Sequence, residues 1–235
     1  MTLPEHVPLV KPLLARNDAE ARHNRAHFDA HGVLAVNLMS APGSGKTLLL
    51  EATIRALGAE LPCAVIEGDL ETDNDAARIR RHGVPAIQIT TGSACHLDAH
   101  MVHHALHELE LDGLALLFVE NVGNLVCPAS FALGTHRDVV LVSVTEGDDK
   151  PAKYPVMFRH ADLVLVSKAD LLGVIDDFEV EKVVQGVRAL GNPAPVLAIS
   201  ARSGRGMPAW LEWLRGQRVA LADVAGERRA TLARI

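Results

Sequence analysis

The residues with the clearest chemical potential form a glycine-rich loop between an apolar segment, 33–39, and a helical pattern, 47–61. Gly43 and Gly45 allow backbone N–H groups to turn toward a phosphate, and Lys46 is long enough to reach β- and γ-phosphates. The pattern predicts a P-loop. Its nucleotide-binding residues are predicted to be Gly43, Ser44, Gly45, Lys46, Thr47 and Leu48, with the Thr47 hydroxyl as a Mg²⁺ ligand.

Ser40 is the one departure from the usual P-loop pattern, because it occupies the position of the first glycine in G-x-x-x-x-G-K-[ST]. The alternative interpretation is a glycine-rich turn with a Lys-Thr pair beside it by chance. The strand that precedes the loop and the helix that follows it favour a P-loop.

Acidic side chains follow two other predicted strands and are expected at the same sheet edge. Asp69 and Asp75 come after the second strand, and Glu120 ends the fourth. Carboxylates near a triphosphate indicate Mg²⁺, bound directly or through water. A solvated acidic helix start is the alternative for Asp69 and Asp75. Glu120 and Gly123 predict a nucleotide-sensing switch, and Lys46, Asp69 and Glu120 are the predicted catalytic residues.

The sixth predicted strand runs into Lys168 and Asp170, which predict selectivity for a guanine base. The Asp170 carboxylate can accept two hydrogen bonds from guanine, which adenine cannot donate, while the Lys168 stem covers the ring. The loop at Ser200 and Ala201 is expected to offer backbone N–H groups to guanine O6. Ser167 stands where GTPases usually have asparagine, so one base contact or loop-bracing bond is expected to differ.

These motifs belong to an alternation of apolar and helical segments that predicts an α/β fold with a doubly wound, mostly parallel sheet. Asn17 or Asp18 is expected to cap the first helix. The strands are predicted at 33–39, 63–67, 86–90, 114–120, 139–145, 163–167 and 196–200, and the helices at 13–31, 47–61, 73–82, 96–109, 176–190 and 207–215.

Composition limits the class of protein further. The chain has 235 residues and a formal net charge of −6, so it has no basic surplus for nucleic acid or an anionic membrane. No apolar run approaches the ~20 residues of a membrane span, and the start lacks the layout of a signal peptide. We expect a cytoplasmic protein with a P-loop domain at 33–235, which contains an inserted metal site, and an N-terminal helical extension at 1–32.

A histidine-rich segment follows the third predicted strand. At about 100° per residue, its histidines fall on one arc of a helix and apolar side chains cover the opposite side. We therefore expect the histidines to face away from the core. A polar face that is merely rich in histidine remains an alternative, above all for His103 and His107. The histidines of this segment are His96, His100, His103, His104 and His107.

Two cysteines near this segment predict a metal site. Cys95 is expected at the helix N-terminus, where the helix dipole lowers a thiol pKa, and Cys127 follows the fourth strand at the same edge. Two thiolates and the His96 imidazole suit Zn²⁺ or Ni²⁺. Three ligands leave the site incomplete, so either His100 and His104 or a second subunit is expected to complete it.

These motifs together resemble the hydrogenase nickel-incorporation GTPases, the HypB family. The resemblance extends from about 17 to 213 and includes the P-loop. It also rests on Glu-Gly-Asp at 67–69, Cys-His-Leu-Asp-Ala-His at 95–100, Glu-Asn-Val-Gly-Asn-Leu-Val-Cys-Pro at 120–128 and Glu-Gly-Asp-Asp-Lys-Pro at 146–151. Unlike some members, this N-terminus has no Cys-x-x-Cys motif or long histidine tract, so metal storage there is not expected.

The resemblance implies a SIMIBI-type P-loop GTPase that uses GTP, GDP and Mg²⁺ and forms a homodimer favoured by GTP. It implies Ni²⁺ or Zn²⁺ held by Cys95, His96 and Cys127 at the dimer interface. It also implies nickel delivery to a [NiFe]-hydrogenase large-subunit precursor, with a HypA-type nickel-binding protein as partner. A urease-type nickel accessory GTPase, a P-loop small-molecule kinase and a metal-buffering protein are the alternatives.

Overall fold

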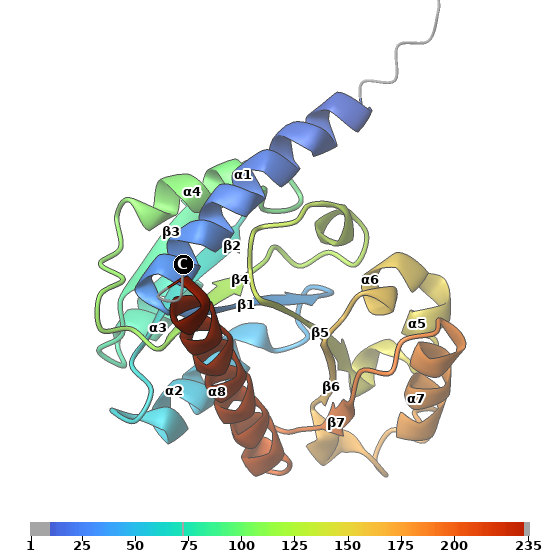
Figure 1. Ribbon diagram of the computed structural model, residues 1–235. Helices are drawn as coiled ribbons and strands as arrows, with labels where there is room; N and C mark the ends of the chain where they lie inside the picture. Colours follow the sequence, from blue (N-terminus) through green and yellow to red (C-terminus); the bar gives the residue numbers. More distant parts are fainter. Residues whose placement is uncertain (1–9, 72, 233–235) are drawn as a thin grey trace, which may run out of the picture.

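The computed structural model describes residues 10–71 and 73–232, and a seven-stranded sheet forms its centre (Figure 1). Across the sheet the order is β3-β2-β4-β1-β5-β6-β7, and the neighbouring strands pair in parallel. This confirms the predicted doubly wound α/β fold. The strands are β1 (Leu34–Ser40), β2 (Cys63–Asp69), β3 (Ala86–Thr90), β4 (Leu116–Glu120), β5 (Arg137–Ser143), β6 (Leu163–Ser167) and β7 (Val196–Ala198).

Helices cover both faces of the sheet. They are α1 (Val10–His31), α2 (Lys46–Leu57), α3 (Asn74–Arg80), α4 (Ala99–Leu106), α5 (Lys150–Lys153), α6 (Pro155–Arg159), α7 (Val180–Ala189) and α8 (Met207–Leu232). Three short 3₁₀ helices are η1 (Cys127–Ser130), η2 (Val144–Glu146) and η3 (Ala169–Leu171). In the part of the chain that the structure describes, no helix is both long and apolar enough to cross a membrane.

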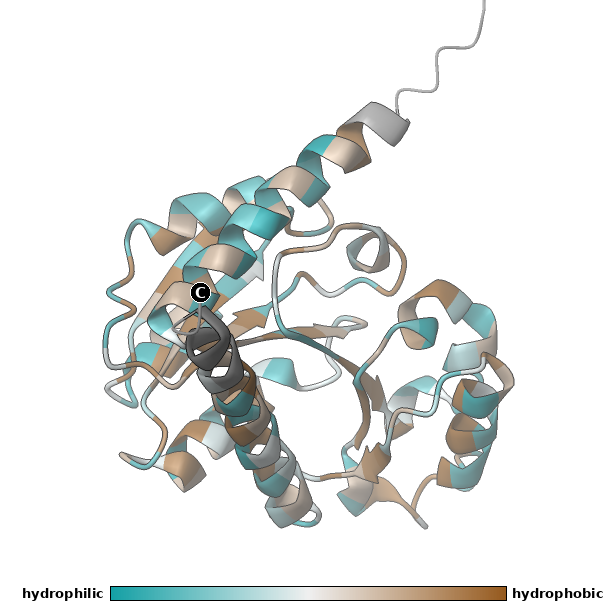
Figure 2. Cartoon of the chain, in the orientation of Figure 1, coloured by the Kyte–Doolittle hydropathy of each residue, from teal (hydrophilic) through white to brown (hydrophobic). Residues whose placement is uncertain are grey.

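The five inner strands are buried on both faces, which explains their nearly continuous apolar sequences, and the edge strands β3 and β7 are partly buried. Figure 2 shows the hydrophobic residues of the central strands. One face packs on α2, α3 and α8, with Trp210 fully buried among side chains of β1 and α2. The opposite face has two clusters. One lies under α1 and α4 around Phe28, and the other lies under α6 and α7 around Phe158.

The first helix differs from its prediction at its start. The helix α1 begins at Val10, so Asn17 and Asp18 lie inside it and neither is its N-cap. Asn17 instead uses its amide in tertiary contacts: it donates to the Ala132 carbonyl at 2.8 Å and accepts from the Ala99 N–H at 2.9 Å. These bonds hold α1 against the start of α4.

The histidine-rich helix is shorter than predicted. The Asp98 carboxylate accepts the backbone N–H of Met101 at 2.8 Å and caps α4, so the helix begins at Ala99 and not at 96. Cys95 therefore lies in a loop. Among the other segments, α2 ends at Leu57 before Gly58, β5 begins and ends two residues earlier than predicted, and α8 continues to Leu232.

Candidate nucleotide and metal sites

A pocket of about 360 Å³ lies at the carboxyl ends of β1, β2 and β4. This is the edge at which a doubly wound sheet presents its loops. The structure brings together here most of the predicted phosphate and cation residues, from four separate segments. They are Gly43, Gly45, Lys46, Thr47, Leu48, Asp69, Asp75, Glu120 and Gly123.

The P-loop has the backbone that its glycines permit. Gly43 and Gly45 have φ values of 75° and 93°, in the left-handed region, and Gly45 caps α2. The Lys46 ammonium donates to the Ser40 hydroxyl at 3.0 Å. Ser40, which stands where the P-loop pattern has its first glycine, thus contacts the lysine of that pattern.

Three carboxylates meet beside the P-loop. Ligand atoms of Glu67, Asp75 and Glu120 all lie within 4.8 Å of one another. Glu67 is 2% exposed and Glu120 is 3% exposed, and one carboxylate oxygen of each has no hydrogen-bond partner. The Thr47 hydroxyl donates to the other Glu120 oxygen at 2.9 Å. Buried, unpaired carboxylate oxygens beside a threonine hydroxyl are the hard oxygen donors that Mg²⁺ prefers, so these residues fit Mg²⁺.

Burial makes these carboxyl groups reluctant to ionise in the metal-free protein. Burial first, and the nearby Glu120 carboxylate second, raise the pKa of Glu67 to about 8. Burial likewise raises the pKa of Glu120 to about 7, against the opposing charge of Lys46. A divalent cation would remove much of the repulsion among these carboxylates.

Asp75 and Asp69 differ in how they are held. Asp75 accepts from the Arg78 guanidinium at 2.9 Å, and Arg78 also pairs with Glu51. Asp69 lies at the end of β2, where its carboxylate accepts the Glu71 backbone N–H at 3.0 Å. Asp75 therefore belongs to the carboxylate cluster, whereas Asp69 lines the same pocket outside it.

Gly123 packs directly on the P-loop. A Cβ atom at this position would lie 2.8 Å from the Cα of Pro42, a distance that side chains do not tolerate. Only glycine allows the segment after β4 to approach the loop this closely.

A second pocket, of about 270 Å³, continues from the P-loop toward β6 and β7. It gathers the predicted base-binding residues Lys168, Asp170, Ser200 and Ala201, together with Ser44, Gly45 and Leu48 of the P-loop region. The Ser167 hydroxyl donates to the Ser44 carbonyl at 2.7 Å. Serine at this position therefore still supplies a bond that braces the P-loop.

Asp170 is exposed and faces this pocket as a carboxylate. A hydrogen bond from Ser200 lowers the pKa of Asp170 below its ordinary value, so it is ionised at neutral pH. Lys168 has a left-handed backbone, with φ of 56°, and its ammonium donates to the Thr145 hydroxyl at 3.2 Å. This rare backbone conformation at Lys168 places the Asp170 carboxylate and the aliphatic part of the Lys168 side chain beside the same pocket.

The predicted cysteine site is assembled from two loops. Ligand atoms of Cys95, His96 and Cys127 lie within 4.8 Å of one another. The two Sγ atoms are 3.1 Å apart, and Cys95 Sγ is 3.8 Å from His96 Nδ1. The Asn124 side chain donates to the Cys95 carbonyl at 3.1 Å. Two sulfur atoms and one imidazole nitrogen at these distances are a donor set that fits Ni²⁺ or Zn²⁺.

The prediction that a helix dipole lowers the pKa of Cys95 is wrong, although Cys95 lies in the cluster with His96 and Cys127 as predicted. Because Asp98 caps α4, Cys95 does not lie at the helix N-terminus. Its pKa is raised, first because its thiol shares a hydrogen bond with Cys127 and then by desolvation. Partial burial lowers the pKa of His96 and keeps its imidazole neutral, which is the form that binds metals.

The structure does not bring His100 and His104 into this cluster. Their Nε2 atoms face each other at 3.2 Å, one helical turn apart on α4. The prediction that every histidine of the segment faces away from the core is wrong for His103, which packs against α1 beside Asn24. Within residues 10–71 and 73–232, the cysteine cluster thus has three ligands.

Three residues of these sites have no prediction from sequence. Glu67 belongs to the Glu-Gly-Asp motif at 67–69 and has no role of its own from sequence, although a carboxylate inside an otherwise apolar strand is a signal of a buried polar site. Glu146 accepts the Ser44 hydroxyl at 2.5 Å from a different strand end. Asn121, which follows Glu120 and is 1% exposed, accepts the backbone N–H of Leu97. Nothing in the sequence pairs the last two with their partners.

Comparisons with known proteins agree with this geometry. The family described as CobW/HypB/UreG, nucleotide-binding domain, matches residues 34–197. The hydrogenase maturation factor HypB of Azotobacter chroococcum mcd 1 is 55% identical over 213 residues, which are 90% of this chain and 69% of that protein. This chain belongs to the HypB family.

Solved structures of the HypB family have the same fold. The structure of HypB from Helicobacter pylori in complex with nickel has a TM-score of 0.84 and 41% identity, and covers 87% of this chain and 96% of its own. HypB from Archaeoglobus fulgidus has a TM-score of 0.80 and 42% identity, and covers 87% of this chain and 99% of its own. The sheet and pockets described above therefore belong to the family's P-loop domain.

Proposed function

We propose that this protein is a Mg²⁺-dependent GTPase that acts as a metallochaperone and assists the insertion of nickel into [NiFe]-hydrogenase. The observation that carries the proposal is the position of two sites at one sheet edge. A phosphate pocket with a carboxylate cluster lies beside a cluster of two thiols and an imidazole. The similarity to HypB proteins, which are named hydrogenase maturation factors, supports the biological role.

The P-loop residues act on the phosphates of the nucleotide. Lys46 supplies positive charge to the β- and γ-oxygens, and backbone N–H groups at the start of α2 add to it. Glu67, Asp75, Glu120 and Thr47 are the residues that would hold Mg²⁺. When bound, Mg²⁺ neutralises charge that develops on the transferred phosphoryl group. We assign Asp69, at the pocket rim, to orienting the attacking water.

The second pocket supports GTP as the nucleotide. Asp170 is a carboxylate there, so it accepts from the N1–H and amino group of guanine. The Lys168 stem covers the ring, and Ser200 and Ala201 lie where backbone N–H groups can meet O6. GDP is then the product that remains on the protein.

Cys95, His96 and Cys127 are proposed to bind the nickel that is delivered, or Zn²⁺ in its place. Three protein ligands leave a coordination position for the recipient or for a second subunit. Val126, beside Cys127, is 60% exposed, which supports a protein surface at this point. We therefore propose a homodimer favoured by GTP.

The proposed setting is the cytoplasm, where thiols remain reduced and able to bind metal. The proposed partners are a HypA-type nickel-binding protein and the precursor of the hydrogenase large subunit. The nickel that appears in the Helicobacter pylori HypB structure supports nickel as the metal.

Nucleotide and metal measurements on the purified protein test the proposal. We expect hydrolysis of GTP over ATP in the presence of Mg²⁺, release of free phosphate, and nickel transfer to an apo-hydrogenase precursor that depends on GTP. A phosphorylated small-molecule acceptor would indicate a kinase instead. Transfer that proceeds equally without nucleotide would contradict a GTP-driven metallochaperone.

A further inference from the structure

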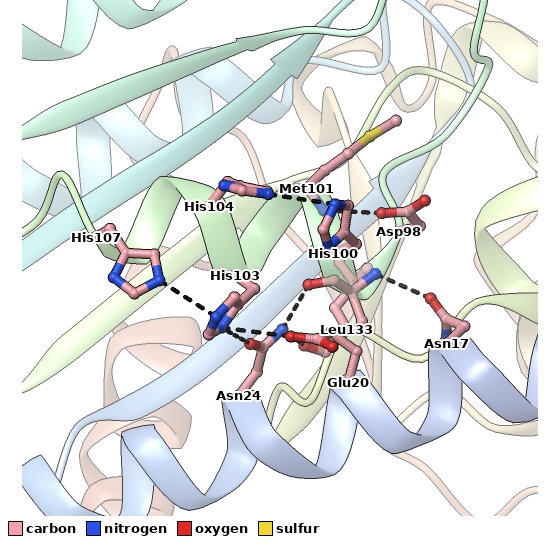
Figure 3. A network of polar contacts seen from close by, with 11 residues as sticks. Asn17, Glu20, Asn24, Asp98, His100, Met101, His103, His104, His107 and Leu133 are labelled. Carbon is pink, nitrogen blue, oxygen red and sulfur yellow. Dashed lines mark hydrogen bonds and ion pairs between the residues drawn. The ribbon is translucent and has the colours of Figure 1, made fainter.

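Histidines of α1 and α4 form a cluster where these two helices pack together. Figure 3 shows His103 and His107 on α4 above Asn24 and Glu20 of α1. The ring of His23, on α1, has its centre 4.8 Å from that of His103, and His107 has its ring centre 4.7 Å from His103 on another side. We call His23, His103 and His107 the interhelix histidine cluster.

The proton on His103 is placed by Asn24. The Asn24 amide nitrogen donates to two carbonyl groups, those of Ala99 at 2.8 Å and Leu133 at 3.1 Å, so the orientation of the amide is unambiguous. Its oxygen therefore faces His103 Nδ1, 3.2 Å away, and that nitrogen must carry the proton. The lone pair of His103 is consequently on Nε2.

This arrangement resembles the support that proteins give to a metal-binding histidine. A ligating imidazole usually donates its other N–H to an amide or carboxylate, which fixes the ring and its tautomer. His103 donates its Nδ1–H to the Asn24 amide oxygen, and the Glu20 carboxylate lies nearby, with Oε1 3.6 Å from the same nitrogen. Its side chain is 19% exposed, and desolvation lowers its pKa, so the imidazole is neutral at neutral pH.

The bare Nε2 of His103 points at a second imidazole at a distance suited to metal binding. His107 Nε2 is 3.2 Å from His103 Nε2, and the two residues are one helical turn apart. Two nitrogens bound to one ion at about 2.0–2.1 Å in tetrahedral geometry lie about 3.3–3.4 Å from each other. Histidines at i and i+4 are a known helical arrangement for holding Zn²⁺.

We propose that the interhelix histidine cluster is a second metal site, separate from the cysteine cluster, for a borderline divalent cation such as Ni²⁺ or Zn²⁺. His103 and His107 supply two ligands from α4. His23, exposed on α1, supplies the third after a side-chain rotation, and water fills the open position. Imidazole nitrogens suit these cations. Metal bound here ties α1 to α4.

A second pair on α4 provides a matched control. His100 and His104 have the same spacing and the same Nε2 separation of 3.2 Å. Both are exposed, and no hydrogen bond to Nδ1 of either is found in the described part of the chain that would fix the tautomer. Neither has a ring contact with a histidine of α1. The proposal therefore predicts that this pair binds more weakly than His103 and His107.

The test is titration of Ni²⁺, and separately Zn²⁺, into the full chain carrying Cys95→Ala and Cys127→Ala, without nucleotide. We expect about one ion per chain to remain bound. Adding His107→Ala is expected to weaken that binding by about tenfold or more. His23→Ala is also expected to weaken it, whereas His31→Ala, on the same helix, is the control that leaves it unchanged. Binding is expected to raise Tm, since the ion joins two helices.

Several results would overturn the proposal. One is the absence of bound metal in the cysteine-free variant at concentrations near those of the protein. Another is an equal loss of binding with His100→Ala plus His104→Ala and with His107→Ala, which would indicate only scattered surface histidines. His107 is exposed, so its replacement tests the site without disturbing the packing of His103.

Discussion

The backbone N–H of Leu97 donates to the side-chain oxygen of Asn121 at 3.1 Å, inside the protein. Leu97 directly follows His96 of the cysteine cluster, and Asn121 directly follows Glu120 of the carboxylate cluster. The Leu97 side chain is fully buried and packs on Gly68, where an added Cβ atom would lie 2.7 Å from its Cγ. One hydrogen bond and one packing contact thus join the loop of the cysteine cluster to the sheet edge that carries the P-loop pocket.

Replacing Asn121 by alanine is expected to loosen this connection. The change leaves the Leu97 N–H without its partner, which costs about 1–3 kcal/mol of stability in a buried position. We expect urea unfolding to show that loss, and we expect nucleotide to change Ni²⁺ affinity less than in the unaltered protein. Asn192→Ala is the control, because Asn192 is a buried amide that bonds the Phe158 and Ala161 carbonyls instead. Equal nucleotide effects in both variants would contradict this connection.

Lys46→Ala is expected to lower the rate of GTP hydrolysis by about a hundredfold or more, because the lysine stabilises charge on the transferred phosphoryl group. Triphosphate binding is also expected to weaken. The circular-dichroism spectrum is expected to remain native, since in the described part of the chain the Lys46 ammonium donates one hydrogen bond, to the Ser40 hydroxyl. Lys153→Ala, a surface lysine with a side chain that is 59% exposed, is the control. Unchanged turnover in Lys46→Ala would refute the assignment.

Asp170→Asn is expected to change base preference. In the proposed GTP complex the carboxylate accepts two hydrogen bonds from guanine, whereas an asparagine amide offers a donor that suits the extra carbonyl of xanthine. We expect affinity for GTP to fall and affinity for xanthosine triphosphate to rise, measured by competition binding. Asp177→Asn, an exposed aspartate outside the pocket, is the control. If the ratio of the two affinities does not move, Asp170 does not select the base.

The fold, the P-loop and the three members of the cysteine cluster could be predicted from sequence because each depends on local patterns. Buried strands between helices give continuous apolar segments, and the loops after them must meet at one edge. Cys95, His96 and Cys127 follow two such strands, so their meeting required no knowledge of side-chain packing.

The failed predictions have one local cause and two causes that involve contacts between distant segments. The position of Asp98 as cap shortened α4 and removed Cys95 from a helix terminus. The helix α1 packs on α4 with Asn24 against His103. His103 is therefore partly buried, although the sequence pattern places it on the polar face of α4. The sequence does not show the partners of Glu67, because only the fold brings its carboxylate together with those of Asp75 and Glu120.

Glu67 is expected to make the metal-free protein less stable as pH rises. Its pKa is about 8 in the folded protein and 4.5 ordinarily, so the folded state binds more protons than the unfolded state between these values. Stability therefore falls from about pH 4.5 to 8, by at most about 1.4 kcal/mol per pH unit for this group. Glu67→Gln is expected to reduce that slope in urea unfolding, most clearly between pH 7 and 8, where Glu120 with its pKa of about 7 contributes less. Glu60→Gln, at the surface, is not expected to reduce it. Identical slopes would show that Glu67 titrates normally.

The last prediction joins nucleotide and nickel binding. Cys127 follows Gly123 closely in the chain, and Gly123 packs on Pro42 of the P-loop. A P-loop that closes on a γ-phosphate must therefore move the segment that carries this thiol. We expect Ni²⁺ and Zn²⁺ affinities to differ among the nucleotide-free, GDP-bound and GTP-analogue-bound forms.

Thermodynamic linkage between the two binding sites allows this prediction to be tested by a second, independent measurement. If GTP changes metal affinity by some factor, metal must change GTP affinity by the same factor, typically worth about 1–3 kcal/mol. Metal binding is also expected to release protons and to weaken below about pH 6, as the thiolates and imidazole become protonated. Titrations of both ligands, in both orders, measure the two factors, and Cys127→Ala is expected to abolish the effect. Equal metal affinities in all three nucleotide states, or an unaltered site without Cys127, would show that the two sites share a sheet edge but act independently.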